Sequence, residues 1–410
     1  MRIAVFNARY SANLGDGILA RCLDEELLRQ KAEVLPCDLA GRTTWGEGAS
    51  RRKHTLAVLD CMPSSLRRRA IEFALGREVR NNLQPRWREM LPSADAVLAG
   101  GGQLLADIDL NFPLKLNGLC EELSRAGKSW GLFAAGASAH WSRRGRELFV
   151  QAFMRARPSF VLVRDEASRR IAVELLAPCG LPAIRVCPDP AVLSHLGFPA
   201  PPREPRSRPV LGINLAAPSE IQLHTGAALR PPEFLRWFAE LARLALEAGY
   251  EVRLFTNGNL ADDESLRVLE RRWPAATPQP CFLPRPLEPQ ALASAIAGCD
   301  VVIGHRLHLH IPAFSYRIPS AGILWEEKMR SFFLATGREK YLLDQRTRSP
   351  REAWALLQQA QSEGVDEAMW RSVVASAQTA VREACGWLGS PEAGGSKGPC
   401  HEPEGMDPHR

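Results

Sequence analysis

The sequence predicts an α/β protein built from two doubly wound, Rossmann-like units that face a cleft. Short runs of β-branched and other apolar residues alternate with helical stretches, the order typical of parallel sheets covered by helices. The length of 410 residues suits two to three domains. A proline-rich segment at 199–209 separates two copies of this pattern, as a stiff polar linker would.

The N-terminal unit is predicted to span residues 1–198. Its first strand leads, through a glycine-containing turn, into a helix with Leu19, Leu23 and Leu27 on one face. The expected elements, in order, are a strand at 2–7, a turn at 13–17, a helix at about 18–30 and strands at 96–100, 129–135, 159–163 and 183–187.

The C-terminal unit is predicted to span residues 210–388 and to repeat the alternation. From 389 to 410 the chain is rich in Gly, Pro and Ser with few apolar residues, so this tail is predicted to be disordered. The expected elements of the unit are a strand at 210–214, a helix at 233–248 and strands at 251–255, 299–304 and 321–325.

Composition indicates an ordinary globular protein, with 45% hydrophobic and 24% charged residues. The net charge of +6 is a mild excess without a concentrated basic stripe, which argues against nucleic-acid binding. Ten scattered cysteines without a C-x-x-C pair favour free thiols in a reducing cytosol. The sequence shows no secretory signal and no apolar run of about 18 residues, so we expect a cytoplasmic protein without a membrane span.

The most informative stretch is the apolar run at 299–303 together with the polar residues that follow it. Arg306 and His308 are two residues apart, so in an extended chain they would point to the same side, at the carboxyl end of a central strand. Open α/β sheets bind ligands at that edge. An arginine and a histidine there suit a small, multiply charged anion in a reaction that moves a proton. Alternatively, Arg306 holds a domain interface and His308 belongs to the core.

A metal site is a further interpretation of the same stretch, with His305, His308 and His310 as ligands. No acidic or cysteine partner stands at metal-ligand spacing, and Pro312 follows directly. We therefore expect no metal.

Small and polar residues also follow the first predicted strand. Gly15 and Gly17 would let backbone N–H groups face a ligand, Asn13 precedes them, and Asp16 could cap the next helix. A plain helix-capping turn explains these residues equally well.

Further groups follow later strands. Gly101 and Gly102 belong to a triple glycine that permits close backbone approach to an anion, or a tight strand-to-helix crossing. Arg164 and Asp165 follow another strand and could instead form a structural ion pair. Asp189 begins an Asp-Pro-Ala turn, which we interpret as structural.

In this order and spacing, these residues resemble the polysaccharide pyruvyl transferase family, from about residue 2 to residue 344. Residues 38–95 show little similarity to the family. Residues 315–317 are Ser-Tyr-Arg in this chain, where relatives often carry glycine. The residues that carry the resemblance are Asn13, Gly15, Asp16, the glycines at 100–102, Arg164, Asp165, Ser168, Asp189, Pro190, Ala191, Asp300, Arg306, Leu307, His308, Ala313, Pro319, Lys328, Phe332 and Gly337.

The resemblance implies a glycosyltransferase-B-like fold, phosphoenolpyruvate as donor and a sugar of a surface polysaccharide precursor as acceptor, joined as a pyruvate ketal. It implies no cofactor beyond this co-substrate. The ligand-binding R-L-H element of the family carries over onto Arg306, Leu307 and His308, with Arg164 as the second arginine.

A mechanism can be written for these residues. Arg306 and Arg164 would each hold one anionic group of the donor, and Asn13, Gly101 and Gly102 would complete the donor site. The candidate catalytic residues are His308 as acid or base and Asp16 or Asp165 as its partner.

The acceptor in such pathways is often lipid-linked, so the resemblance implies a cytoplasmic enzyme that can lie at the inner face of the membrane. The segment 63–80 would suit such contact as a basic amphipathic helix, unless it is only a solvated face. In it Arg67, Arg68, Arg69, Arg77 and Arg80 interleave with Leu66, Ile71, Phe73, Leu75 and Val79.

Two other functions stay open. The first is a nucleotide-sugar-dependent glycosyltransferase on the same fold, with Glu326 or Glu327 holding a ribose. The second is a non-catalytic member of a polysaccharide assembly complex. Phosphate release from phosphoenolpyruvate, or nucleotide release from a sugar nucleotide, separates the two enzymatic functions.

Overall fold

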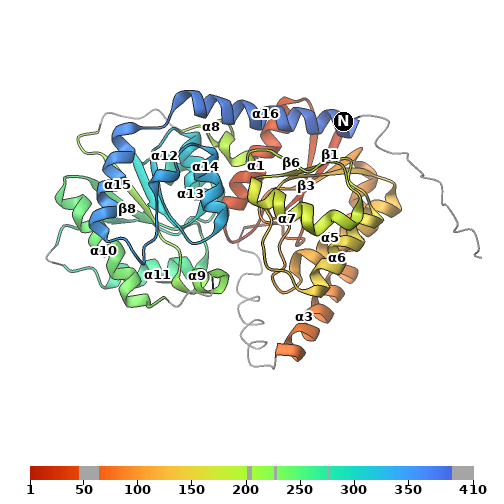
Figure 1. Cartoon of the computed structure of the whole chain (residues 1–410), viewed down its shortest axis with the longest axis horizontal. Helices are drawn as coiled ribbons and strands as arrows, with labels where there is room; N and C mark the ends of the chain where they lie inside the picture. The colour runs from red at the N-terminus through yellow and green to blue at the C-terminus, as the bar shows by residue number, and fades with distance from the viewer. Residues whose placement is uncertain (46–63, 201–205, 226–228, 276, 390–410) are drawn as a thin grey trace, which may run out of the picture.

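A computed structural model describes residues 1–45, 64–200, 206–225, 229–275 and 277–389. In this part of the chain, two sheets of six parallel strands each are covered by helices on both faces (Figure 1). The strand order is β2-β1-β3-β4-β5-β6 in the first sheet and β12-β11-β10-β7-β8-β9 in the second. The predicted α/β fold of two Rossmann-like units is confirmed.

The first sheet and its helices form the N-terminal lobe, and the second sheet and its helices form the C-terminal lobe. The strands of the first sheet are β1 (Arg2–Asn7), β2 (Glu33–Asp38), β3 (Ala96–Gly100), β4 (Ser129–Ala135), β5 (Val161–Val163) and β6 (Arg185–Val186). Those of the second are β7 (Val210–Asn214), β8 (Glu251–Phe255), β9 (Cys281–Phe282), β10 (Val301–Gly304), β11 (Ser320–Ile323) and β12 (Leu342–Leu343).

The helices fall into the same two sets, apart from the last one. The first set is α1 (Leu14–Arg29), α3 (Ser64–Glu78), α4 (Gln84–Met90), α5 (Asn111–Ala126), α6 (Arg143–Arg155), α7 (Glu166–Leu176) and α8 (Ser194–Gly197), with short turns η1 (Val79–Leu83), η2 (Leu91–Ser93), η3 (Ala177–Cys179) and η4 (Pro190–Leu193). The second is α9 (Pro218–Thr225), α10 (Pro231–Glu247), α11 (Leu260–Arg271), α12 (Pro289–Ala297), α13 (Leu307–Ser315), α14 (Glu327–Ala335), η5 (Glu339–Tyr341) and α15 (Pro350–Glu363). The last helix is α16 (Glu367–Gly389). Among the helices described, none is both long and apolar enough to cross a bilayer.

The start of the first helix differs from the prediction. Helix α1 begins at Leu14, so the predicted turn at 13–17 is wrong after its first residue. Asn13 is the N-cap, and its side chain accepts a hydrogen bond from the backbone N–H of Gly15. Asp16 therefore lies in the first turn of the helix, where its charge suits the helix dipole, and does not cap it.

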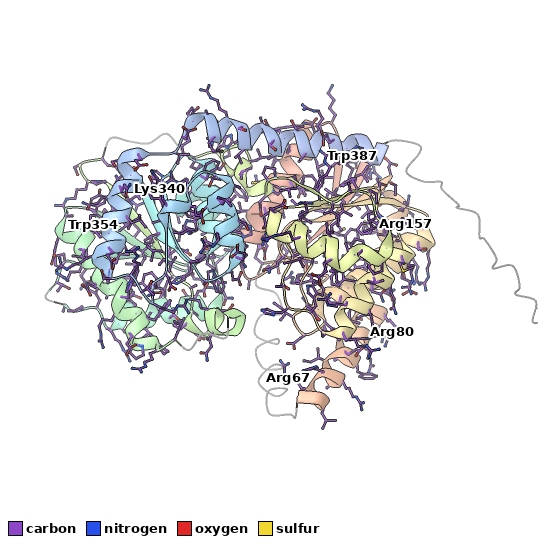
Figure 2. All side chains as sticks on the ribbon, in the orientation of Figure 1. Arg67, Arg80, Arg157, Lys340, Trp354 and Trp387 are labelled. Carbon is purple, nitrogen blue, oxygen red and sulfur yellow. The ribbon has the colours of Figure 1, made fainter. Side chains whose placement is uncertain are left out.

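The C-terminal helix α16 leaves its own lobe and packs on the first sheet (Figure 1). Val381, Ala384 and Leu388 are buried in one hydrophobic core with residues of β1, β3 and β4. Figure 2 shows Trp387 at the end of this helix, over the N-terminal lobe, where its ring lies 4.9 Å from that of Phe160. Residues 201–205 of the predicted linker and 390–410 of the predicted tail lie outside the described residues.

A third hydrophobic core lies between the lobes. Ile18 of α1 is buried with Leu292 and Ile296 of α12 and with Leu309 of α13. At the start of α1, the backbone N–H of Leu14 donates to the carbonyl of Asn257, which belongs to the other lobe, at 2.9 Å. The lobes are therefore held together by buried apolar surface and by main-chain hydrogen bonds.

One glycine sets how closely the lobes approach. A Cβ atom at Gly15 would lie 2.3 Å from the Cβ of His308, closer than packed carbon atoms allow. Only glycine at this position lets α1 lie directly against the His308 side chain of α13.

We predict that Gly15→Ala destabilises the protein, although alanine is normally favoured over glycine inside a helix. The added methyl group overpacks the lobe interface, at an expected cost of about 1–3 kcal/mol. Gly386→Ala in α16 is the control: nothing lies within 4 Å of its Cβ position, so this change should stabilise by roughly 0.5–1 kcal/mol. Thermal unfolding of both variants tests the prediction, and equal stabilisation by both would contradict the packing described.

Candidate active site

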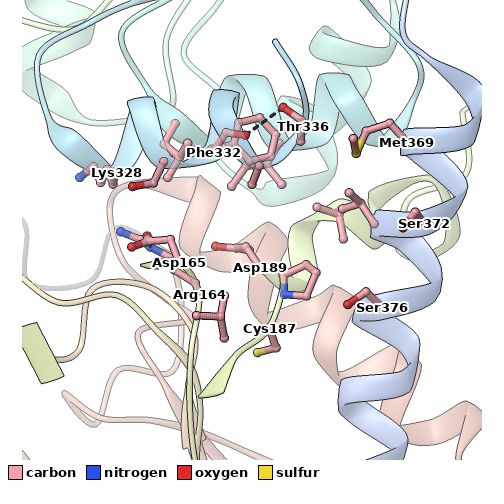
Figure 3. Close-up of a pocket in the computed structure, with 18 residues that line it drawn as sticks. Arg164, Asp165, Cys187, Asp189, Lys328, Phe332, Thr336, Met369, Ser372 and Ser376 are labelled. Atoms are coloured by element: carbon pink, nitrogen blue, oxygen red, sulfur yellow. Dashed lines mark hydrogen bonds and ion pairs between the residues drawn. The ribbon is translucent and has the colours of Figure 1, made fainter. Parts of the chain in front are cut away.

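A pocket of about 280 Å³ lies where the lobes meet, and α16 closes one side of it (Figure 3). Arg164, Asp165 and Asp189 approach it from the carboxyl ends of β5 and β6, as expected for ligand-binding residues of a parallel sheet. Lys328 of α14 and Leu307 of α13 line it from the C-terminal lobe. Charged groups from both lobes thus converge on one small space.

His308 stands between two carboxylates of the other lobe. Its Nε2 lies 3.5 Å from Asp189 Oδ2, and its Nδ1 lies 4.0 Å from Asp16 Oδ1. Asp189 is nearly fully buried, whereas 21% of the Asp16 side chain is exposed. The imidazole therefore connects a buried carboxylate to a more accessible one.

Asp189 is held in place by its own turn. Its Oδ1 accepts a hydrogen bond from the backbone N–H of Ala191 at 3.0 Å, which leaves Oδ2 for His308. Burial raises the pKa of Asp189, but the neighbouring His308 and the charge of Arg164 outweigh burial and hold this pKa below its ordinary value. Asp189 is therefore ionised at neutral pH and can orient the imidazole.

Arg164 lies flat over Gly136, where a Cβ atom would be 2.5 Å from the guanidinium carbon. Its Nε lies 3.3 Å from Asp165 Oδ2. Its buried Nη2 has no hydrogen-bond partner among the described residues. An unsatisfied buried donor is costly unless a ligand completes it, so Arg164 is a candidate anion-binding group.

Asp165 lines the same pocket, but both its oxygens are engaged. Oδ1 accepts the backbone N–H of Ser168 at 2.7 Å and so caps α7, while Oδ2 contacts Arg164. In this arrangement Asp165 fixes Arg164 and the helix. Among the described residues, the carboxylates that contact His308 are those of Asp16 and Asp189.

Lys328 supplies the second cation of the pocket. Its Nζ donates to Oε1 of Gln103, in the loop after the triple glycine, at 3.2 Å, and it forms an ion pair with Glu326. Burial and the positive charges of Arg164 and Arg306 lower the pKa of Lys328 below 10.5, while Glu326 opposes them. Arg164 and Lys328 thus bring two positive charges, one from each lobe, to the same pocket.

Arg306 does not point where an extended chain would direct it. Strand β10 ends at Gly304, Arg306 is the N-cap of α13, and His308 is the second residue of that helix, at a kink where φ is −77° and ψ is 18°. Arg306 Nε and Nη2 donate to the two oxygens of buried Asp262 at 3.0 and 2.7 Å. The expectation that Arg306 and His308 share one side is therefore wrong: Arg306 faces its own lobe and His308 faces the other.

The glycine loop and Asn13 are also engaged internally. The backbone N–H of Gly101 donates to the carbonyl of Phe133 at 2.8 Å. Gly101 and Gly102 have φ of 77° and 68°, which favours glycine, and a Cβ at Gly102 would lie 3.4 Å from Asp16 Oδ1. Asn13 caps α1 and accepts a bond from the Asn257 side chain at 3.5 Å, so its position joins the lobes.

The neighbouring histidines belong to the core. His305 stacks on Phe234 with ring centroids 5.4 Å apart, and burial lowers its pKa to about 3. Burial also lowers the pKa of His310 to about 4, and its Nε2 lies 3.0 Å from the Gly304 carbonyl. The described residues contain no group of three or more His, Cys, Asp or Glu that could hold a metal ion.

Two charged residues of the pocket, Asp189 and Lys328, were not among the predicted site residues. Asp189 was interpreted as a structural turn, although its place after a strand at the carboxyl edge of the sheet was a usable signal. Lys328 was named only as one of the residues that carry the resemblance to the family, without a role in the site. Cys187, another residue of the pocket lining, is not a candidate nucleophile, because burial raises the pKa of its thiol to about 12.

Solved structures share the fold of this chain. A UDP-GlcNAc 2-epimerase from Neisseria meningitidis, bound to UDP-GlcNAc, is 11% identical with a TM-score of 0.57, and 95% of this chain and 99% of that chain are covered. A UDP-GlcNAc 2-epimerase from Methanocaldococcus jannaschii is 10% identical with a TM-score of 0.52, over 87% of this chain and 92% of that one. The likeness confirms the glycosyltransferase-B-type arrangement of two Rossmann-like domains.

No curated protein sequence matches the chain. A family model does: that of the polysaccharide pyruvyl transferases matches residues 13–327, well over half of the 410 residues. The matched range begins at Asn13 and includes Asp16, Arg164, Asp189 and His308. The chain therefore belongs to the polysaccharide pyruvyl transferase family.

Proposed function

We propose that this protein transfers pyruvate from phosphoenolpyruvate to a pair of hydroxyl groups on a sugar of a surface polysaccharide or its lipid-linked precursor. The product is a pyruvate ketal, and phosphate is released. The observation that carries the proposal is the interlobe pocket, in which Arg164 and Lys328 lie close to the His308–Asp189 pair. Family membership supports the same reaction class.

The donor carries a phosphate and a carboxylate, so it needs two groups of hydrogen-bond donors. Arg164 offers a buried Nη2 without a partner among the described residues, and Lys328 offers an ammonium group. Arg306 is bound to Asp262, and its guanidinium lies 5.6 Å from the Trp325 ring, while Leu307 contributes apolar lining to the pocket. A small dianion fits this distribution of charge.

The reaction needs protons to move at four places: the methylene carbon, the two sugar hydroxyl groups and the leaving phosphate. The methylene carbon of the enol gains one proton, which makes the neighbouring carbon electrophilic. One sugar hydroxyl adds there and loses its proton, the C–O bond to phosphate breaks, and the second hydroxyl closes the ring and loses its proton. One of the two released protons balances the carbon protonation and the other goes to the leaving phosphate, so no cofactor or metal is needed in this scheme.

His308 is our candidate to move these protons. Asp189 holds Nε2, which leaves Nδ1 facing Asp16 and the accessible side of the site. Asp16 can then accept a proton from a sugar hydroxyl, directly or through the imidazole. We propose a cytoplasmic location, where the donor is available, and no nucleic-acid partner.

We predict that Arg164→Gln and Lys328→Met each raise the KM for phosphoenolpyruvate roughly 10–100-fold, because each removes a charge-assisted hydrogen bond. Acceptor-dependent phosphate release and the thermal shift caused by the donor measure the effect. Arg169→Gln is the control, since Arg169 lies on α7, which begins two residues after Arg164, but pairs with Glu166 and does not line the pocket. Release of nucleotide from a sugar nucleotide, without phosphate release from phosphoenolpyruvate, would instead establish the glycosyltransferase function.

We predict a different outcome for the proton-transfer residues. His308→Gln should lower kcat on the order of 10²–10⁴-fold with little change in the KM for the donor. Asp189→Asn, a positioning change, should lower kcat by a smaller factor and again spare KM. If either variant loses donor binding in the thermal-shift assay while kcat is kept, the assigned roles are wrong.

A further inference from the structure

Helix α3 has two apolar faces that differ in exposure. Ile71 and Val79, in α3 and the turn that follows, are buried against the N-terminal lobe. On the opposite side, Leu66 and Phe73 are 52% and 68% exposed. Seven residues make about two helical turns, so these two side chains stand one above the other. Two large apolar groups thus project from one outward face.

Unpaired arginines share this face. Arg69 and Arg77 follow Leu66 at helical spacing on either side of Phe73, and Arg80 continues the row into η1. All three are exposed, and within the described part of the chain no carboxylate forms an ion pair with them. The face therefore combines apolar and cationic groups in one stripe.

The acidic residues of α3 are turned elsewhere. Glu72 pairs with Arg144 of α6 at 2.7 Å, and Glu78 accepts a hydrogen bond from Asn82 at 2.6 Å. The positive charge of the outward face is therefore not balanced within the helix.

The helix is fixed to the loop that leads from the active site. Arg67 makes a bidentate ion pair with Asp109, at 2.7 and 3.2 Å. This loop starts at the triple glycine and includes Gln103, the partner of Lys328, and Ile108, which is 40% exposed. Figure 1 shows α3 extending from the N-terminal lobe, and Figure 2 places Arg67 at its far end. This ion pair thus connects α3 to the loop that leads to the pocket.

We propose that the outward face of α3, formed by Leu66, Arg69, Phe73, Arg77 and Arg80, docks on an anionic phospholipid surface. Arginines can contact lipid phosphates while the two apolar side chains enter the interface between headgroups and acyl chains. A stripe of five side chains is small against the roughly 800 Å² that each partner buries in a stable protein–protein interface. Charge and size therefore both favour lipid, and the inference does not depend on the proposed donor.

The test uses the full-length protein and vesicles of phosphatidylcholine with and without phosphatidylglycerol. We expect co-sedimentation with the anionic vesicles only, weakened by salt. Combining Arg69→Ala, Arg77→Ala and Arg80→Ala should weaken the partition on the order of 100-fold. Phe73→Ser should weaken it on the order of tenfold. Because these side chains are exposed, the unfolding temperature should not change.

A charge-matched control removes three exposed arginines of the C-terminal lobe: Arg236→Ala, Arg271→Ala and Arg351→Ala. This variant should bind anionic vesicles like the wild type, and an equal loss would overturn the proposal. Equal binding to vesicles with and without phosphatidylglycerol, or no binding to either kind of vesicle, would also overturn the proposal. If the wild type is a dimer in sedimentation velocity and Phe73→Ser separates it, the face belongs to a second copy of the chain and not to lipid.

Discussion

The contact between Gly15 and His308 is the constraint on which the site depends. It lets the first turn of α1 lie against the second residue of α13, so that the imidazole of one lobe enters the other lobe. Once there, His308 meets Asp16 from the same turn of α1 and Asp189 from the turn after β6. A larger side chain at position 15 would separate these groups even if each lobe kept its own fold.

The two arginines near the pocket differ in how many hydrogen-bond partners they have, and this difference indicates where a ligand would bind. Arg306 is satisfied by two bonds to Asp262, with Glu220 3.7 Å away, so the C-terminal lobe already neutralises it. Arg164 has only the 3.3 Å contact to Asp165, and its buried Nη2 has no partner among the described residues. A fold that keeps such a group unsatisfied gives up stability that an anionic ligand can return.

Much of the fold could be predicted because strand and helix patterns are local. Strands β1 and β3 could be predicted from their runs of apolar residues. Strand β2 is hard to recognise in the sequence, because it is an edge strand that contains Pro36. The site could be located at the carboxyl edge of the sheets, but the partners of its residues could not. Arg306 pairs with Asp262 across 44 positions, and no local pattern reports such a distant partner.

The same reasoning explains why the spacing of Arg306 and His308 led to a wrong prediction of where their side chains point. A separation of two residues predicts one shared side only if the chain stays extended, and here a helix begins at Leu307. The boundary of a helix depends on caps and tertiary contacts, which residue type alone specifies to within a few positions. Because the helix begins between Arg306 and His308, the two side chains enter different lobes, whereas an extended chain would have placed them on one side.

Glu326 already forms an ion pair with Lys328, one of the cations that an incoming anion would contact. The ring of Trp325 lies 5.6 Å from the Arg306 guanidinium and 5.4 Å from Lys328 Nζ. Burial of two bare cations beside one ring would be costly, and Glu326 offsets that cost in the free protein. An anion that binds Lys328 therefore competes with a carboxylate already in place. This competition reduces the affinity that Lys328 can contribute, whereas an anion that also binds Arg164 gains a hydrogen bond that Glu326 does not supply.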